Sequence, residues 1–167
     1  MNTTFKGHPE TGSVLIITIL VLIVLTIVAV AQVSFNSTQT RIATNTTDAQ
    51  IAFQTAQGAL NDATNNLFAN TYSTSGFLAN ANGLYLFNPN AAPLWTTVDW
   101  TNAGAVITSF QGSSNAQAAF IIEQLPSVIA GGQNLDLPTQ VYRITVRAVG
   151  ASGGSPVILQ STVKIQL

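Results

Sequence analysis

An uninterrupted apolar run, Val14 to Val33, limits what this chain can fold into more than any other part of the sequence. At about 1.5 Å of rise per residue, twenty helical residues span the ~30 Å hydrocarbon core of a bilayer. The run holds no charged residue, Pro or Gly, and its polar residues are Thr18, Thr26 and Gln32. A helical threonine returns its hydroxyl to a backbone carbonyl. We therefore expect one membrane-spanning helix.

A stripe of apolar residues continues this helix beyond the span. Its members are Phe35, Ile42, Ala49, Phe53, Ala56, Leu60, Ala63 and Leu67. Steps of three, four and seven residues place them on one helix face. We expect the part from Phe53 to Leu67 (Phe53, Ala56, Leu60, Ala63 and Leu67) to pack on the chain's own domain. The stretch from Ser34 to Thr47 is rich in Ser, Asn and Thr, which compete for the helical backbone. We expect that stretch to be loose outside an assembly.

The C-terminal part reads as β-structure. Apolar and polar residues alternate from Tyr142 to Ala148 and again from Val157 to Ile165, which predicts a hairpin with one apolar face. We expect that face to pack on the helix and Arg143, Arg147 and Lys164 to share the solvent face. Further strands are expected at 94–98 and at 117–123, the latter ending before Pro126. The predicted fold is α+β, a long N-terminal helix packed on a small antiparallel sheet.

The predicted organisation has four segments. They are a polar leader at 1–12, a membrane or filament-core half of the helix at 13–33, an amphipathic half at 34–69, and a β-rich domain at 70–167. Charged residues make up 7% of the chain, and the net charge is −1. Because no basic patch is present to neutralise phosphates, we expect no nucleic-acid partner.

The inventory of reactive side chains argues against an enzyme. The chain has no Cys, and its one histidine, His8, lies in the leader. The acids beyond the leader are scattered, whereas general acid–base catalysis uses His or tuned carboxylate pairs. Asp136 beside a Gly-Gly loop is far short of the oxygen ligands that calcium needs. We expect no catalytic site, no cofactor and no metal.

Two processing sites compete at the N-terminus. Ala29-Val30-Ala31 before Gln32 matches a signal-peptidase site, which would release a soluble secreted binding domain. Alternatively, cleavage falls between Gly12 and Ser13 and the apolar helix is retained. In the leader, Glu10 offsets Lys6, which makes a poor basic n-region for a signal peptide and favours the second site.

Several segments resemble one family of pilus proteins. They are GSVLIITILVLIVLTIVAVA followed by IAFQTAQGALNDA, then AFIIEQLP, and finally YRITVRAVGASGGSPVILQSTVKIQL. The first resembles the class III signal of type IV pilins and pseudopilins, and together they resemble the PilX family of minor pilins. The resemblance implies cleavage by prepilin peptidase after Gly12 and N-methylation of Ser13. It also implies a single inner-membrane pass before assembly and a place in the cell-surface pilus afterwards.

One residue departs from the common pilin pattern. Most pilins carry Glu as the fifth residue of the mature chain, where this chain has Ile17. In the family picture, that Glu offsets the N-terminal amine of a neighbouring subunit. A subunit with Ile17 avoids burying a carboxylate but cannot form that pair. The resemblance therefore implies a place at or near the pilus tip, in a minor-pilin complex that initiates assembly, with adhesion or twitching motility as associated roles. The partners implied are other minor pilins and the major pilin. The tip-most pseudopilin of type II secretion also lacks the Glu and is an alternative, although it usually carries a large extra domain.

Overall fold

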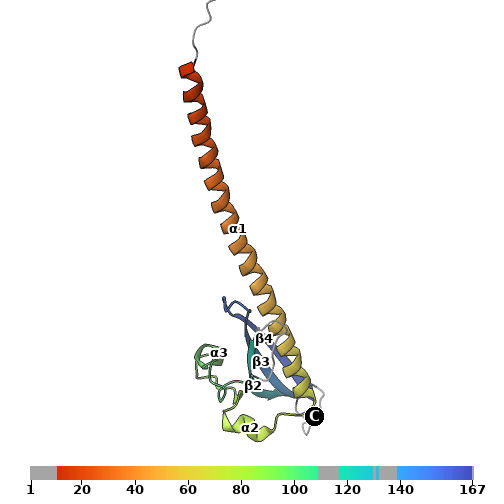
Figure 1. Cartoon of the computed structure of the whole chain (residues 1–167). Coiled ribbons are helices and arrows are strands. Elements are labelled where there is room, and N and C mark those ends of the chain that lie inside the picture. Colours follow the sequence, from red (N-terminus) through yellow and green to blue (C-terminus); the bar gives the residue numbers. More distant parts are fainter. Residues whose placement is uncertain (1–10, 109–116, 130, 132–138, 167) are drawn as a thin grey trace, which may run out of the picture. The chain divides into compact units, whose positions relative to one another are not determined.

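The computed structural model describes residues 11–108, 117–129, 131 and 139–166. The elements follow in the order α1 (Thr11–Phe68), α2 (Thr74–Ala79), β1 (Leu84–Leu86), α3 (Leu94–Thr97), β2 (Gln117–Val128), β3 (Thr139–Val149) and β4 (Val157–Gln166) (Figure 1). The chain divides into two compact units, 1–44 and 45–167. Most of the expected leader lies outside the described residues.

In the first unit, the described residues are helical throughout. The expectation of a loose stretch from Ser34 onward is wrong, because this stretch belongs to α1. Three threonine hydroxyls (Thr38, Thr40 and Thr44) each donate to the carbonyl four residues earlier, at 2.9–3.1 Å. These side chains thus bond within the helix rather than drawing the backbone into another conformation.

The second unit contains a four-stranded sheet in the order β1-β2-β3-β4. The predicted hairpin is confirmed, since β3 and β4 pair antiparallel from Ala148↔Val157 to Thr139↔Gln166. β2 pairs antiparallel with β3 on its other side. β1 joins β2 in parallel, so the sheet is mixed rather than purely antiparallel.

β2 is longer than the sequence predicted. It continues past Pro126 to Val128, and its pairing with β3 shifts register between Leu125 and Val128. Proline has no N–H to donate to a ladder, so it is accommodated where the pairing is irregular.

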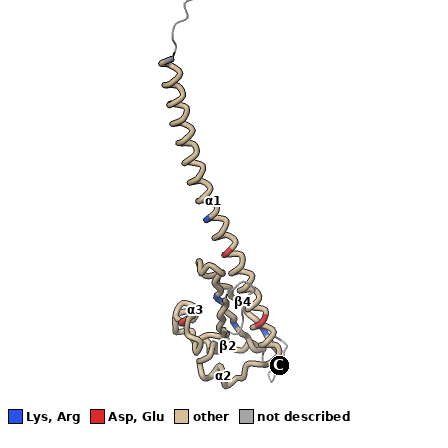
Figure 2. The backbone as a smooth tube through the Cα atoms, viewed as in Figure 1, with Lys and Arg blue, Asp and Glu red and all other residues tan. Residues whose placement is uncertain are grey.

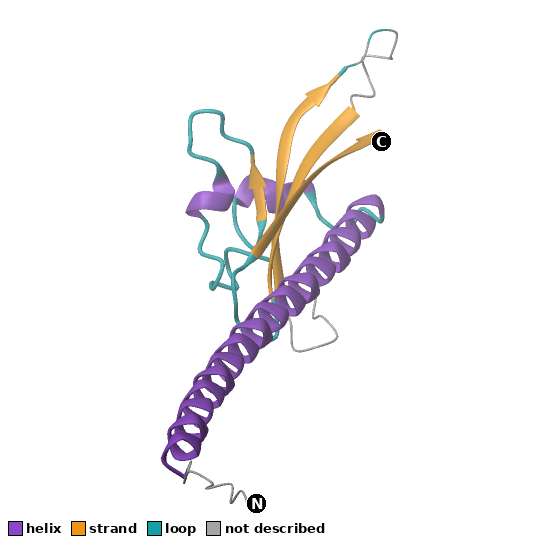
Figure 3. Ribbon diagram, turned by 90° about the horizontal axis from the view of Figure 1, so that it is seen from above, coloured by secondary structure: helices purple, strands orange, loops and turns teal. Residues whose placement is uncertain are grey.

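The hydrophobic core lies between the C-terminal half of α1 and one face of the sheet (Figure 3). The helix contributes three small side chains, Ala56, Ala59 and Ala63, together with Leu67. The sheet contributes larger side chains, which include Phe120, Ile122, Ile144 and Val146. The alanines are fully buried. Small residues on the helix let its backbone approach the sheet closely, and the large sheet residues fill the space between them.

The buried helix face differs in part from the expected stripe. Ala56, Ala63 and Leu67 lie in the core, and Leu60 packs partly buried against it. Phe53 is 44% exposed and lies outside the core. Around the helix axis, Phe53 lies on one side of Ala56 and the buried residues Ala52 and Thr55 lie on the other, so the packed face is rotated away from Phe53.

Part of the chain between β1 and β2 lies along the edge of β2 that also pairs with β1. The expectation of a strand at 94–98 is wrong, because Leu94–Thr97 form the short helix α3 after Pro93. Farther along, Ile107 exchanges backbone hydrogen bonds with Phe120 of β2, at 2.9 and 3.0 Å. Gly83, at φ +79°, meets this segment so closely that a Cβ there would collide with Ile107.

Candidate functional site

The first candidate functional feature is the apolar part of α1. Every residue from Val14 to Val33 is exposed in the chain on its own. Figure 2 shows the helix without charge until Arg41. Soluble monomers rarely expose contiguous apolar patches larger than a few hundred Å². This segment is long and apolar enough to cross a membrane, and it needs either lipid or protein around it.

The threonines of this segment suit an apolar environment. Thr18 donates to the Leu15 carbonyl at 2.8 Å, and Thr26 donates to the carbonyls of Leu22 and Ile23 at the same distance. Each hydroxyl is therefore satisfied inside the helix. An unsatisfied donor in hydrocarbon costs several kcal/mol, roughly, and these hydrogen bonds avoid that cost.

Two residues near the start of α1 carry the predicted processing and tip position. Gly12 has no atom within 4 Å of the place where a Cβ would be. The fold therefore sets no requirement for glycine there, and a need for a small residue has to come from outside the chain. Ile17 is 58% exposed, on a segment that offers no carboxylate. The cleavage site and the role of Ile17 remain predictions.

A buried carboxylate joins α1 to the β3–β4 turn. Asp48 is 7% exposed and accepts a hydrogen bond from the Ser152 N–H at 2.9 Å. A Cβ on Gly150 would collide with the Asp48 side chain, so glycine is required for this approach. The Ser152 N–H first, then the Ser152 hydroxyl and the Gly154 N–H, hold the pKa of Asp48 below its usual 3.8, while burial opposes them. The carboxylate is therefore charged at neutral pH and fixes the turn on the helix.

On the opposite face of the sheet, β2 and β3 are joined by an ion pair. Arg143 donates two hydrogen bonds to Glu123, at 2.8 and 2.9 Å, and Glu123 is 4% exposed. The guanidinium also lies 5.1 Å from the ring centroid of Phe87. The expectation that Arg143 is a solvated charge is therefore wrong. Arg147 lines a cleft on the same face. Lys164, which belongs to β4, pairs with Val141 of β3.

The described residues form no recognisable catalytic or metal site. Among them, no group of three or more His, Cys, Asp or Glu side chains is placed to hold a metal ion. Asp136 and His8 lie outside the described residues. The carboxylates that are described take structural partners, as Asp48 and Glu123 show.

The comparison with protein families decides the family. Residues 34–165 match the family described as type IV pilus assembly protein PilX C-term. The chain belongs to the PilX family. This match begins at Ser34, so it is independent of the leader and the apolar run that first suggested a pilin. No curated protein and no solved structure matches the chain.

Membership of the PilX family explains why the chain has an exposed apolar helix. PilX proteins are structural components of the pilus, and the chain takes part in type IV pilus assembly. A membrane-anchored pilus component needs one long apolar helix, which this chain has at its N-terminal end. The family match also covers the described parts of 70–117, where the sequence alone showed no likeness.

Proposed function

We propose that this PilX protein is a minor pilin that initiates type IV pilus assembly within a minor-pilin complex at or near the pilus tip. The observation that carries the proposal is the combination of a PilX domain with an exposed, uncharged helix that has Ile17 at the usual Glu position. The partners are other minor pilins and the major pilin. Roles in adhesion and twitching motility follow from a place at the exposed end.

Maturation is the first step. Prepilin peptidase cuts between Gly12 and Ser13, and the new amine of Ser13 is methylated. The open space around Gly12 supports this assignment, because no packing in the chain itself explains the glycine. The mature protein then spans the inner membrane once through the helix that begins at Val14.

Assembly transfers the apolar helix from lipid to contacts with other helices. Little hydrophobic free energy separates these environments, so close packing and small residues drive the association. Ala29, Ala31 and Ala43 provide such small positions on α1. The folded domain, with its own core from Ala56 to Ile165, keeps its structure through this transfer.

The mass of the mature N-terminus tests the proposal. We expect a chain that starts at methylated Ser13 when the protein is purified from membranes or pili. In the Gly12→Val variant we expect the full-length precursor to accumulate. A start at Gln32 would show release of a soluble domain and would contradict the proposal. Persistence of Met1 in the native chain would identify an unprocessed membrane anchor and would also contradict it.

Deletion and labelling test the assembly role. A strain that lacks the protein is expected to carry few or no surface pili, and the native gene restores them. An epitope placed in the folded domain is expected at pilus ends. Normal piliation in the deletion strain would contradict a role in initiation, and uniform labelling along the filament would contradict the tip position.

A further inference from the structure

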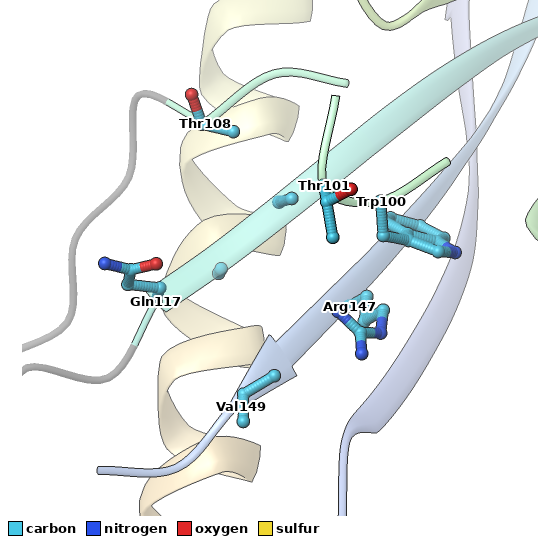
Figure 4. A pocket seen from close by; sticks show the side chains of 8 residues that line it. Trp100, Thr101, Thr108, Gln117, Arg147 and Val149 are labelled. Atoms are coloured by element: carbon cyan, nitrogen blue, oxygen red, sulfur yellow. The ribbon is translucent and has the colours of Figure 1, made fainter. Parts of the chain in front are cut away.

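A cleft opens on the outer face of the sheet, where β2 begins and β3 ends (Figure 4). Its volume is about 510 Å³, within the range of sites that hold small molecules. The side chains that matter here are Arg147, Trp100, Thr101, Thr108, Gln117 and Ala119. None of them belongs to the apolar helix or to the core.

Arg147 brings an uncompensated positive charge to this cleft. Its cross-strand neighbours are Ala119 on β2 and Ile158 on β4. Arg143, four residues earlier on the same strand, faces Glu123 instead and forms the ion pair. In the part of the chain that the structure describes, Arg147 has no acidic side chain within ion-pair distance. Ala119 pairs with Arg147 as Glu123 pairs with Arg143, but its methyl group is too short to fill the space that a glutamate side chain would occupy. The Arg147 guanidinium therefore faces an open cavity.

Trp100 supplies a fixed aromatic surface beside that charge. Its indole N–H donates to the Trp95 carbonyl at 3.2 Å, which uses the one polar group of the ring and fixes its orientation. The ring is half-buried and lies beside Arg147 (Figure 4). Trp100 therefore lines the cleft with an apolar ring whose one polar group already has a partner.

Uncharged polar groups complete the lining. The Thr101 hydroxyl donates to Asp99 at 2.6 Å and so keeps lone pairs that accept a hydrogen bond. The exposed Gln117 amide offers both a donor and an acceptor. A hydroxyl-rich ligand matches such groups, whereas a purely apolar ligand would leave them without partners.

We propose that this cleft binds a carboxylated sugar, that is, a uronic acid residue of a polysaccharide. The guanidinium fork of Arg147 pairs with the carboxylate in two parallel hydrogen bonds. The pyranose ring packs on Trp100, and the ring hydroxyls bond to Thr101 and Gln117. A neutral sugar would leave Arg147 unused, and a small inorganic anion would leave the aromatic platform unused. This proposal concerns the folded domain and does not rest on the tip position.

Fluorescence of Trp100 reports on this site directly. Trp95→Phe leaves Trp100 as the only tryptophan and keeps the backbone carbonyl that accepts its indole N–H. The full chain in detergent micelles is titrated with methyl β-glucuronide and, separately, with methyl β-glucoside. We expect a saturable change with the glucuronide and an affinity for the glucoside that is lower by roughly tenfold or more, as loss of a charge-assisted hydrogen bond implies.

Variants then assign the carboxylate contact. Arg147→Gln in the same background is expected to weaken glucuronide binding by roughly tenfold or more. Lys164→Gln removes one positive charge from the same face of the sheet, but at a position outside the cleft. We expect this variant to leave glucuronide binding unchanged. Equal weakening in both variants would overturn the proposal, since it would reflect net charge alone.

Titration of the native chain, in which Trp95 and Trp100 both contribute fluorescence, compares the same ligands without any substitution. Equal affinity for glucoside and glucuronide would overturn the proposal, because Arg147 would then have no role. Acetate or phosphate binding as tightly as the glucuronide would also overturn it, because the ring would then contribute nothing. Absence of any change up to about ten times the ~1 mM dissociation constant of a weak complex would overturn it as well.

Discussion

At the scale of single residues, Asp48 shows how one carboxylate organises a distant turn. Its partner Ser152 lies 104 positions away in the sequence. Asp48→Asn keeps the size of the side chain but removes its charge, and a neutral acceptor forms weaker hydrogen bonds with the turn N–H groups. We expect the variant to have a lower midpoint of thermal unfolding at pH 7, measured by circular dichroism.

The stability difference between wild type and Asp48→Asn is expected to depend on pH. The pKa of Asp48 in the folded chain lies below its usual 3.8, so its charge stabilises the fold above that value. The stabilisation is lost as the pH falls through the folded-state pKa. The difference in midpoint between wild type and Asp48→Asn is therefore expected to shrink as the pH falls below 3.8. Ser152→Ala, which keeps the backbone N–H, serves as the control with a smaller effect. A difference in midpoint that stays constant down to about pH 2 would show that the charge of Asp48 is not the cause of the stabilisation.

A second prediction at this scale concerns the ion pair of Glu123 and Arg143. Arg143→Met keeps an apolar stem over Phe87 but leaves Glu123, which is 4% exposed, without its partner. Loss of hydrogen bonds to a charged group costs about 1.5–3 kcal/mol, and we expect that decrease in the free energy of unfolding in urea. Adding Glu123→Gln is expected to recover part of the loss. A double variant no more stable than Arg143→Met would contradict the view that the orphaned charge is the cause.

At the scale of elements, the packed face of α1 depends on small side chains. Ala59 is fully buried against the sheet, whereas Gln57 on the same helix is exposed. Ala59→Leu inserts three carbon atoms into a filled space, and overpacking of this kind costs typically about 1–3 kcal/mol. We expect that loss for Ala59→Leu and a change within about 0.5 kcal/mol for Gln57→Leu, both from urea unfolding. Equal effects would show that α1 does not pack closely at Ala59.

The same helix shows what the sequence could and could not predict. Strong periodicity predicted the helix, the β3–β4 hairpin and the packing of Ala56, Ala63 and Leu67. The expected place of Phe53 failed because hydrophobicity ranks Phe above Ala, while a close helix–sheet contact selects Ala52 by size. α3 was expected as a strand because Trp, Thr and Val favour strands, yet the turn after Pro93 decides so short a segment.

The charged sites depend on register, which the sequence does not reveal. Arg143 and Arg147 occupy equivalent positions in the alternating pattern of β3. Their different fates follow from the pairing of β2, which places Glu123 beside one and Ala119 beside the other. The cleft at Arg147 also needs Trp100, which the chain brings over the sheet from the segment between β1 and β2. Contacts of this kind depend on tertiary structure and carry no local sequence signal.

At the scale of the whole molecule, the chain divides its apolar residues between two tasks. The buried ones all lie after Asn45, where they fill a core with the sheet, and those from Val14 to Val33 are exposed in the chain on its own. Folding of the domain therefore does not use the surface that assembly needs. The proposed assembly therefore requires no rearrangement of the domain core.

The proposed place of the chain at the pilus tip rests on Ile17, the fifth residue after the proposed cleavage site. Ile17→Glu restores the carboxylate that most pilins carry, at a cost below the about 2.5–3.5 kcal/mol of a charge at the centre of a membrane helix, because Ile17 lies near one end of the apolar run. Under the proposed arrangement, the added carboxylate pairs with the N-terminal amine of the next subunit, so the variant no longer has to stand first. We expect immunogold labelling of an epitope on Ile17→Glu along the pilus shaft, and labelling of the same epitope on the native chain at pilus ends. Ile16→Glu is the matched control, because it adds the same charge one position away, on a residue that is also exposed in the free chain (66% against 58% for Ile17), and gains no such pair. If both variants label the shaft, or both label the ends, the residue at position 17 does not decide where the chain stands in the pilus, and the prediction is wrong.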